Sequence, residues 1–450
     1  MAEIKKILIA NRGEIVQRAI RTIREMGKKS VAVYSAGDKN ASYLKHADEA
    51  VCIGGAKSKD SYLNIPAIIT AAEMTGCDAI FPGYGFLSEN QDFVEICRLH
   101  NIKFIGPSVE VMEKMADKSK AKEEMIRAGV PVVPGSKGAV HSVTEGRKVA
   151  LEIGYPIMAK AAAGGGGRGM RLIKEESEFD QLFMAASSEA LAAFGDGTMY
   201  LERFINNPRH IEVQVVGDSH GNAIHIGERD CSLQRRHQKV IEESPAILLN
   251  DETRAKLHDV AVKATKYLKY EGAGTFEFLA DDKQNIYFME MNTRLQVEHP
   301  VSEMVSGIDI VELMIKVAEG EKVPSQESIK FRGHAIECRI TAEDPNSFLP
   351  CPGKVTQWMV PGGRNVRVDS HVYTNYVVPP YYDSMIGKLI VWGRDRNKAI
   401  NIMKRALAEF EVDGIKTTIP FHQKMMENED FISNNYDTKY LENYKKLEDL

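Results

Sequence analysis

The sequence has few cysteines for its length, and their spacing is irregular. Six occur in 450 residues, and no two form a Cys-x-x-Cys pair. A disulfide scaffold and a cysteine-based zinc finger are therefore excluded. Scattered single cysteines are typical of a reducing compartment, so we expect a cytoplasmic protein.

The sequence also lacks long hydrophobic runs and a strong excess of charge. No run of 18 apolar residues occurs, and the first residues lead directly into a short apolar strand, so neither a membrane helix nor a signal peptide is expected. The formal net charge is −5. This weak acidity gives no reason to expect nucleic acid or an anionic membrane as a partner.

Two common nucleotide-binding motifs are missing. The turn after the first expected strand, residues 11–14 (NRGE), has one glycine instead of G-x-G-x-x-G. The sequence G-x-x-x-x-G-K-[ST] is absent from the only glycine tract. Dinucleotide binding at the first turn therefore has little support, and a P-loop is excluded.

Residues 1–113 alternate between short apolar runs and amphipathic runs. This alternation predicts a doubly wound parallel sheet, which we expect to form an N-terminal Rossmann-like domain. The expected strands are 7–10, 30–34, 50–53, 79–81 and 103–105, and the expected helices are 15–26, 65–74 and 92–100.

The rest of the chain divides at a Pro- and Gly-rich segment, residues 129–135, which follows an expected helix at 118–128. We expect a central domain at 114–330 that includes a small α/β lid at 131–204, and a C-terminal mixed α/β domain at 331–450. The fold class is therefore α/β and α+β.

Residues 274–292 form two alternating runs around a polar turn, which predicts a β-hairpin. If 281–286 form the loop, Ala280 faces Tyr287, Leu279 faces Phe288 and Glu277 faces Glu290. Opposed like charges are destabilising unless a cation lies between them. Carboxylate oxygens suit Mg²⁺ or Mn²⁺, and Asn292 can add a third oxygen.

Arg294, Gln296 and Glu298 continue this period of two beyond Asn292. One polar edge would then carry a metal site and further charged groups. A solvent-facing polar strand would produce the same alternation, so the pattern alone leaves both interpretations open.

Residues 163–169 (AGGGGRG) follow an expected strand that ends at Lys160 and precede another strand. Closely spaced backbone N–H groups in such a loop can surround a phosphate. A flexible linker has the same composition. The strand context favours a flap over nucleotide phosphates.

Residues 229–239 contain five cationic or imidazole groups, and Glu242 and Glu243 follow them. Such a run usually forms a solvated surface. In a chain of acidic net charge it also indicates a local anion site.

Several motifs together resemble those of biotin carboxylases in the ATP-grasp superfamily. The resemblance extends over nearly the whole chain, in the order of that family. The matching segments are 11–14 (NRGE), 82–90 (PGYGFLSEN), 164–170, 228–243, 288–300, 337–340 (ECRI) with 342–345 (AEDP), and 379–387 (PPYYDSMIG).

The resemblance implies ATP bound between two lobes, together with Mg²⁺ or Mn²⁺, and two ions are expected. The implied metal ligands are Glu277, Glu290 and Asn292. The residues it implies for ATP are Lys118, Lys160, Gly166, Gly167, Glu202, Arg203, Phe204, Ile205, His210, Gln234, His237, Glu277 and Glu290.

The implied reaction joins bicarbonate to the γ-phosphate of ATP and then carboxylates biotin through carboxyphosphate. Bicarbonate would contact Lys239, Arg294, Gln296, Val297 and Glu298, with Glu298 as the base. Arg339 would stabilise the ureido oxyanion of biotin. Further candidates near biotin are Tyr84, Arg18 and Asp383.

The family also implies partners. No Met-Lys-Met biotin-attachment motif occurs in the sequence. We therefore expect a separate biotin carboxyl carrier protein and separate carboxyltransferase subunits, as in acetyl-CoA carboxylase or a two-subunit pyruvate carboxylase, and a homodimer. The alternatives are another ATP-grasp ligase and a non-catalytic nucleotide-binding subunit.

Overall fold

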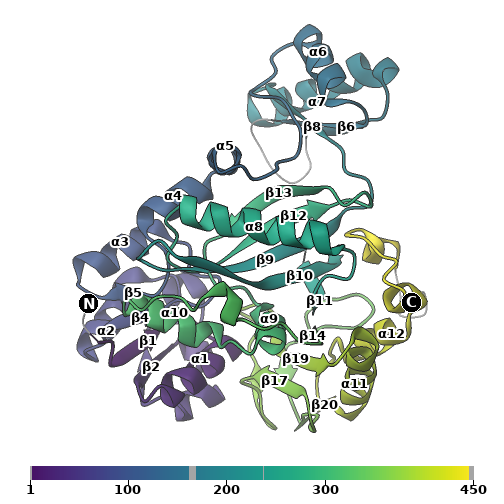
Figure 1. Ribbon diagram of the computed structural model, residues 1–450. Coiled ribbons are helices and arrows are strands. Elements are labelled where there is room, and N and C mark those ends of the chain that lie inside the picture. Colours follow the sequence, from purple (N-terminus) through teal and green to yellow (C-terminus); the bar gives the residue numbers. More distant parts are fainter. Residues whose placement is uncertain (1–2, 162–168, 237, 445–450) are drawn as a thin grey trace.

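The computed structural model describes residues 3–161, 169–236 and 238–444 (Figure 1). The N-terminal part is a five-stranded parallel sheet with the order β3-β2-β1-β4-β5. Its strands are β1 (Lys6–Ile9), β2 (Lys29–Tyr34), β3 (Glu49–Cys52), β4 (Ala79–Phe81) and β5 (Lys103–Phe104). The predicted doubly wound parallel sheet is confirmed.

Helices cover both faces of this sheet. Ile15, Ile20 and Ile23 of α1 pack with Ile7 and Ile9 on one face. The helices α2 and α3 share the other apolar cluster with the remaining strand residues. Alternate residues of each buried strand thus supply two separate cores. The helices are α1 (Glu14–Glu25), α2 (Ile65–Met74), α3 (Gln91–Leu99) and α4 (Val109–Ala116).

A small lobe follows α5 (Lys118–Arg127) and stands apart from the rest of the molecule in Figure 1. It has an antiparallel sheet of order β7-β6-β8 and its own apolar core. Lys160 pairs with Met170, so β6 and β7 form the strands expected around the glycine tract. The elements are α6 (Val143–Ile153), β6 (Ile157–Ala161), β7 (Met170–Ile173), α7 (Phe179–Phe194) and β8 (Met199–Arg203).

The centre of the molecule is an antiparallel sheet of eight strands, with the order β13-β12-β9-β10-β11-β14-β19-β17. Helix α8 (Asp251–Tyr267) lies across it in Figure 1. The strands are β9 (Arg209–Gly217), β10 (Ala223–Arg235), β11 (Gln238–Ser244), β12 (Gly272–Ala280), β13 (Ile286–Asn292), β14 (His334–Thr341), β17 (Val366–Ser370) and β19 (Met385–Gly393).

The pairing of β11 with β14 carries this sheet across residue 330, where we expected a domain boundary. The expected divisions stay a prediction, but the C-terminal strands share one sheet with the central ones. The other elements are α9 (His299–Ser306), α10 (Ile310–Ala318), β15 (Gly353–Lys354), β16 (Gln357–Met359), β18 (Val377–Val378), α11 (Arg396–Glu409), β20 (Glu411–Asp413), α12 (Ile419–Glu427) and α13 (Glu429–Ile432).

The hairpin of β12 and β13 differs from the prediction near its turn. Leu279 faces Tyr287, and Ala280 faces Ile286, one position away from the expected pairs. An irregularity between Glu277 and Phe278 shifts the register back. Glu277 therefore faces Glu290, as predicted.

The expected polar edge beyond Asn292 is not a strand. β13 ends at Asn292, and Glu298 is the N-terminal capping position of α9. The period of two was therefore wrong as an argument from strand geometry, because a turn and not a strand carries residues 293–298.

Among the helices that the structure describes, none has the length and apolarity needed to cross a membrane.

Candidate active site

A cavity of about 920 Å³ opens beside the large sheet. It is lined by the strands β9, β10, β11, β12, β13, β14 and β19, by the turn before α9, and by loops from the N-terminal and C-terminal parts. The predicted site residues along its wall are Tyr84, His210, Gln234, Lys239, Glu277, Glu290, Asn292, Arg294, Gln296, Val297, Glu298, Arg339 and Asp383.

Lys239 is the centre of the charged network in this cavity. Its Nζ donates to Glu212 and Glu298 at 2.6 Å each, to Glu277 at 3.0 Å and to Gln296 at 3.1 Å. Burial alone would lower the pKa of Lys239, but the three carboxylates outweigh burial and hold this pKa well above its usual range. The ammonium therefore stays charged among three nearly buried acids.

Glu298 keeps its charge for the same reason. Burial raises the pKa of its carboxyl, whereas Lys239 and Arg339 lower it, and the net shift is downward. Arg339 Nη2 donates to Glu298 Oε2 at 3.0 Å. An ionised carboxylate in this position can accept a proton.

Arg339 lies between two acids. Its Nε donates to Glu242 Oε1 at 2.5 Å, and its Nη2 donates to Glu298. The two contacts use two sides of the planar guanidinium and define its orientation. Glu242 is fully buried and was not among the predicted site residues.

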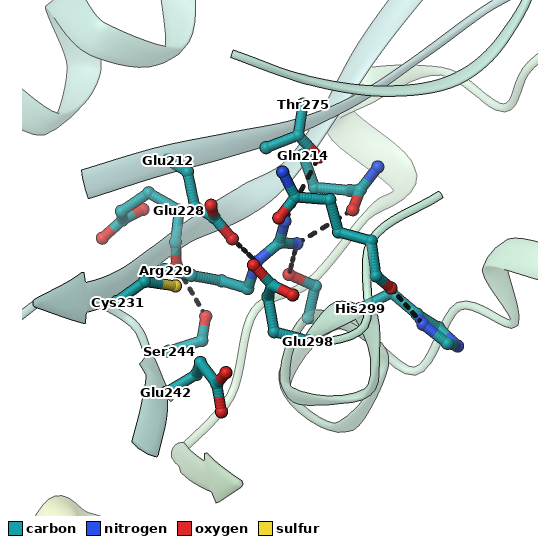
Figure 2. A network of polar contacts seen from close by, with 12 residues as sticks. Glu212, Gln214, Glu228, Arg229, Cys231, Glu242, Ser244, Thr275, Glu298 and His299 are labelled. Carbon is teal, nitrogen blue, oxygen red and sulfur yellow. Dashed lines mark hydrogen bonds and ion pairs between the residues drawn. The ribbon is translucent and has the colours of Figure 1, made fainter. Parts of the chain in front are cut away.

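Polar side chains that were not predicted as site residues form a second layer behind the cavity wall (Figure 2). They belong to Arg229, Glu212 and Gln214. Arg229 Nε donates to Glu212 Oε1 at 2.5 Å, and its Nη1 donates to Gln214 Oε1 at 2.9 Å. The sequence contains a signal for this layer, because His210, Glu212 and Gln214 alternate with apolar residues along β9.

Arg294 is held from two directions. Its Nε donates to Glu89 Oε2 at 2.9 Å, and its Nη2 donates to Asn292 Oδ1 at 2.9 Å. Glu89 belongs to the segment 82–90 but was not a predicted site residue. This contact connects the N-terminal part to the cavity.

The donor atoms around Glu277 fit a hard divalent cation. Glu277 and Glu290 are opposed and both line the cavity. Glu277 Oε1 accepts from Lys239, Gln296 and Asn292, whereas Oε2 lies 3.3 Å from His210 Nε2. Carboxylate oxygens are suitable ligands for Mg²⁺ or Mn²⁺.

Asn292 departs from its expected orientation. Its Nδ2 donates to Glu277 Oε1 at 2.9 Å, and its Oδ1 accepts from Arg294. The carboxylate oxygen of Glu277 can only accept a hydrogen bond, so it faces the amide nitrogen. The guanidinium of Arg294 can only donate one, so it faces the amide oxygen. Its oxygen would face a metal at Glu277 only after the amide turned over.

The side chains of His210 and Gln234, which both line the cavity, also contact each other. Gln234 Nε2 lies 3.1 Å from His210 Nδ1. Burial and Lys239 lower the pKa of His210, but Glu212 and Glu277 outweigh them and raise this pKa to about 9.

Elsewhere in the cavity lining, Tyr84 Oη contacts Glu14, and Glu14 pairs with the buried Lys388 at 3.0 Å. Lys388 Nζ also donates to the carbonyl of Val297 at 2.8 Å. Asp383 Oδ1 accepts from the backbone N–H of Met385, at the start of β19. Arg18 does not line the cavity and instead pairs with Glu303 and Asp309.

Of the predicted ATP residues in the small lobe, those that the structure describes do not line the cavity. Lys160 pairs with Glu202, and Lys122 Nζ also reaches Glu202 at 3.2 Å. The other predicted ATP residues near the end of β8 that do not line the cavity are Arg203, Phe204 and Ile205. Gly166, Gly167 and His237 lie outside the described residues, as does the side chain of Lys118.

Three family models match the chain in succession. They are "Biotin carboxylase, N-terminal domain" at residues 3–112, "Carbamoyl-phosphate synthase L chain, ATP binding domain" at 117–326 and "Biotin carboxylase C-terminal domain" at 337–443. The central match and the carboxylate-lined cavity place the chain among ATP-grasp enzymes.

Individual relatives match over nearly their whole length. A biotin carboxylase of Nostoc sp. is 56% identical over 443 residues, which cover 98% of this chain and 99% of that protein. A crystal structure of a biotin carboxylase–β,γ-ATP complex from Campylobacter jejuni is 68% identical, covers 98% of this chain and 99% of that one, and has a TM-score of 0.90. The biotin carboxylase subunit of a pyruvate carboxylase is 50% identical, with 98% of both chains covered and a TM-score of 0.91.

The chain therefore belongs to the biotin carboxylase family. Its activity is that of an enzyme of this family, the ATP-dependent carboxylation of biotin with bicarbonate.

Proposed function

We propose that the cavity at Lys239 is where ATP, bicarbonate and biotin meet. The observation that carries this proposal is the convergence of Lys239, Glu298 and Arg339 in one hydrogen-bonded network, with Glu277 and Glu290 on the same wall. Cations, a base and a metal-binding carboxylate pair are the groups that phosphoryl transfer and carboxylation need.

We assign the bicarbonate end to Lys239, Arg294, Gln296, Val297 and Glu298. Lys239 and Arg294 supply positive charge, and ionised Glu298 accepts the proton that bicarbonate loses when its oxygen attacks the γ-phosphorus of ATP. Glu298 and Lys239 are 2.6 Å apart in this structure, so bicarbonate would take over contacts that the acids now provide.

We assign the biotin end to Arg339, with Tyr84 and Asp383 nearby on the cavity wall. The guanidinium stabilises negative charge on the ureido oxygen. At the ATP end, Glu277 and Glu290 would hold Mg²⁺ or Mn²⁺, with two ions expected, and His210 and Gln234 would contact the nucleotide. A bound ion neutralises phosphate charge there.

The small lobe completes the ATP site in this proposal. Lys118, Lys160, Gly166 and Gly167 would contact phosphates, and residues 202–205 together with His237 would contact the nucleotide. For this, the lobe of residues 131–204 would have to approach the cavity. The domain divisions at about 113 and 330 belong to the same proposal.

The proposed partners are a biotin carboxyl carrier protein, a carboxyltransferase and a second copy of this chain. Two relatives support them. One is a pyruvate carboxylase subunit from Methanothermobacter thermautotrophicus, and the other is a solved dimer of the biotin carboxylase domain of a Hydrogenobacter thermophilus 2-oxoglutarate carboxylase. Six free cysteines support a cytoplasmic location.

The test measures ADP release with and without bicarbonate and free biotin. We expect ATP cleavage to require bicarbonate and to be stimulated by biotin. We expect the Arg294→Ala substitution to abolish this cleavage. If ADP release ignored both compounds and responded to an amine, the chain would instead be another ATP-grasp ligase.

A further inference from the structure

Two buried acids face each other behind the biotin end of the cavity. Glu242 on β11 and Glu337 on β14 occupy directly opposed positions in the antiparallel pair. Both side chains are 0% exposed. Opposed side chains on neighbouring strands have Cβ atoms only about 5 Å apart. Two ionised carboxylates in such a place would repel each other strongly.

Their hydrogen bonding is incomplete. Glu242 Oε1 accepts from Arg339 Nε at 2.5 Å. Glu242 Oε2 and both oxygens of Glu337 have no hydrogen-bond partner among the residues described. Three buried oxygens without donors are unfavourable as charged acceptors, and a proton on one carboxyl removes a charge and supplies a donor.

We propose that Glu242 is a positioning residue for Arg339, and that it shares one proton with Glu337, so that only one of the two carboxylates is ionised. Glu242 does not line the cavity, whereas Arg339 does, so Glu242 acts on biotin through Arg339. The inference rests on the proposed role of Arg339 at the biotin oxyanion.

The surrounding charges decide which acid holds the proton. Burial raises the pKa of Glu242 to about 7, although Arg339 opposes this shift. Burial raises the pKa of Glu337 well above its usual range, although Lys388 opposes it. Glu337 therefore keeps the proton. The titratable and charged groups that face the pair are Arg339 and Cys338 on β14, Lys388 on β19, Lys239 on β11, Cys231 on β10, Glu298 at α9 and Tyr84.

This arrangement makes the hold on Arg339 depend on pH. Above about pH 7, ionised Glu242 accepts a charge-assisted hydrogen bond from Arg339 Nε. Below that pH a second proton enters the pair and weakens the bond. The guanidinium is then held by Glu298 alone, and its alignment toward biotin loosens.

The test is the ratio of biotin-stimulated to biotin-free ATP cleavage, both with bicarbonate, measured from pH 6 to pH 9. We expect Glu242→Gln to lower this ratio at least tenfold and to abolish its fall below about pH 7. In Glu337→Gln a neutral amide replaces the protonated carboxyl of Glu337 and has nearly the same shape. We therefore expect the ratio of this variant to lie within about twofold of the wild-type ratio.

Glu228→Gln is the matched control. Glu228 is also buried and accepts from an arginine, Arg254 Nε at 2.8 Å, but it does not line the cavity, and Arg254 belongs to α8. We expect the wild-type ratio for this variant. If Glu242→Gln does not fold, Glu242→Asp serves instead, because it keeps the charge and shortens the reach, and it must also lower the ratio.

Two results would overturn the inference. One is a wild-type ratio and pH profile in the Glu242 variants, and the other is a loss in Glu337→Gln as large as in Glu242→Gln. A wild-type enzyme that cleaves ATP without regard to bicarbonate would instead overturn the proposed function. The two failures are therefore distinguishable.

Discussion

The small lobe and the large sheet both carry ion pairs, but under very different conditions. In the lobe, the side chains of Lys160 and Glu202 are 40% and 25% exposed. On the sheet, those of Lys239 and Glu298 are 13% and 2% exposed. Water screens the first pair and is nearly excluded from the second.

The difference in exposure between the two ion pairs distinguishes two ways in which a protein can prepare cations for an anion. In the lobe, water screens the pair of Lys160 with Glu202, so under the proposed function phosphate would replace Glu202 at little cost. The sheet holds its cations and carboxylates in fixed positions before any substrate enters, because each group forms hydrogen bonds with another member of the network. Substitutions in the sheet should therefore change both chemistry and stability. Substitutions in the lobe should change stability little and, if the lobe binds ATP as proposed, should mainly change ATP affinity.

The largest effect is expected at the base. Glu298→Gln retains the size of the side chain and cannot take a proton from bicarbonate. We expect bicarbonate-dependent ATP cleavage to fall by about 10²–10⁴-fold, as for loss of a general base. The measurement is steady-state ADP release at saturating bicarbonate. Activity within tenfold of the wild type would remove Glu298 from this role.

A large loss of stability is expected when Lys239 is removed. Lys239→Ala leaves Glu212, Glu277 and Glu298 buried without their shared cation. Removing one partner of a buried ion pair costs about 3–5 kcal/mol. Urea unfolding followed by circular dichroism measures this free energy, and Lys160→Ala in the lobe, where the lysine side chain is 40% exposed, is the control. Equal losses in both variants would contradict the contrast between lobe and sheet.

The sheet should also show a pH-dependent stability away from the cavity. Burial raises the pKa of Glu228, but His258 and Arg254 outweigh it and lower this pKa to about 2. A depressed pKa contributes stability above the unfolded value near 4.5 that is lost as pH falls toward 2. Glu228→Gln should therefore cost up to about 3 kcal/mol at pH 7.

Urea unfolding of both proteins at several pH values measures this contribution. The difference in unfolding free energy between wild type and Glu228→Gln should shrink steadily below pH 4.5. A difference that stayed constant with pH would show that the lost contribution is packing and not charge.

The smallest effect on stability is expected in the lobe. Lys160→Met removes a half-exposed pair with Glu202, and such pairs contribute about 0–1 kcal/mol. If Lys160 contacts phosphates, KM for ATP should rise about tenfold, which is about 1.4 kcal/mol of binding. Initial rates at varied ATP measure KM. An unchanged KM would place Lys160 outside the ATP site.

The sequence predicted the local elements well, because they depend on local periodicity. The helix at 65–74 and the strand at 79–81 have the expected bounds in the structure. The opposition of Glu277 and Glu290 was predicted correctly, although the pairs nearer the turn were wrong. The register of the hairpin is irregular between Glu277 and Phe278. Alternation of polar and apolar residues alone cannot indicate where a strand contains an extra residue.

What the sequence by itself determined is the order of strands and helices, the opposition of Glu277 and Glu290 and, through the motifs of a known family, most polar side chains of the cavity wall. Only the tertiary structure decided the partners of those side chains. Glu212, Glu242 and Glu89 come from segments that are far apart in the chain. Ionisation depends on burial and on neighbours from several strands, so the charge of each acid was set only when the sheet assembled.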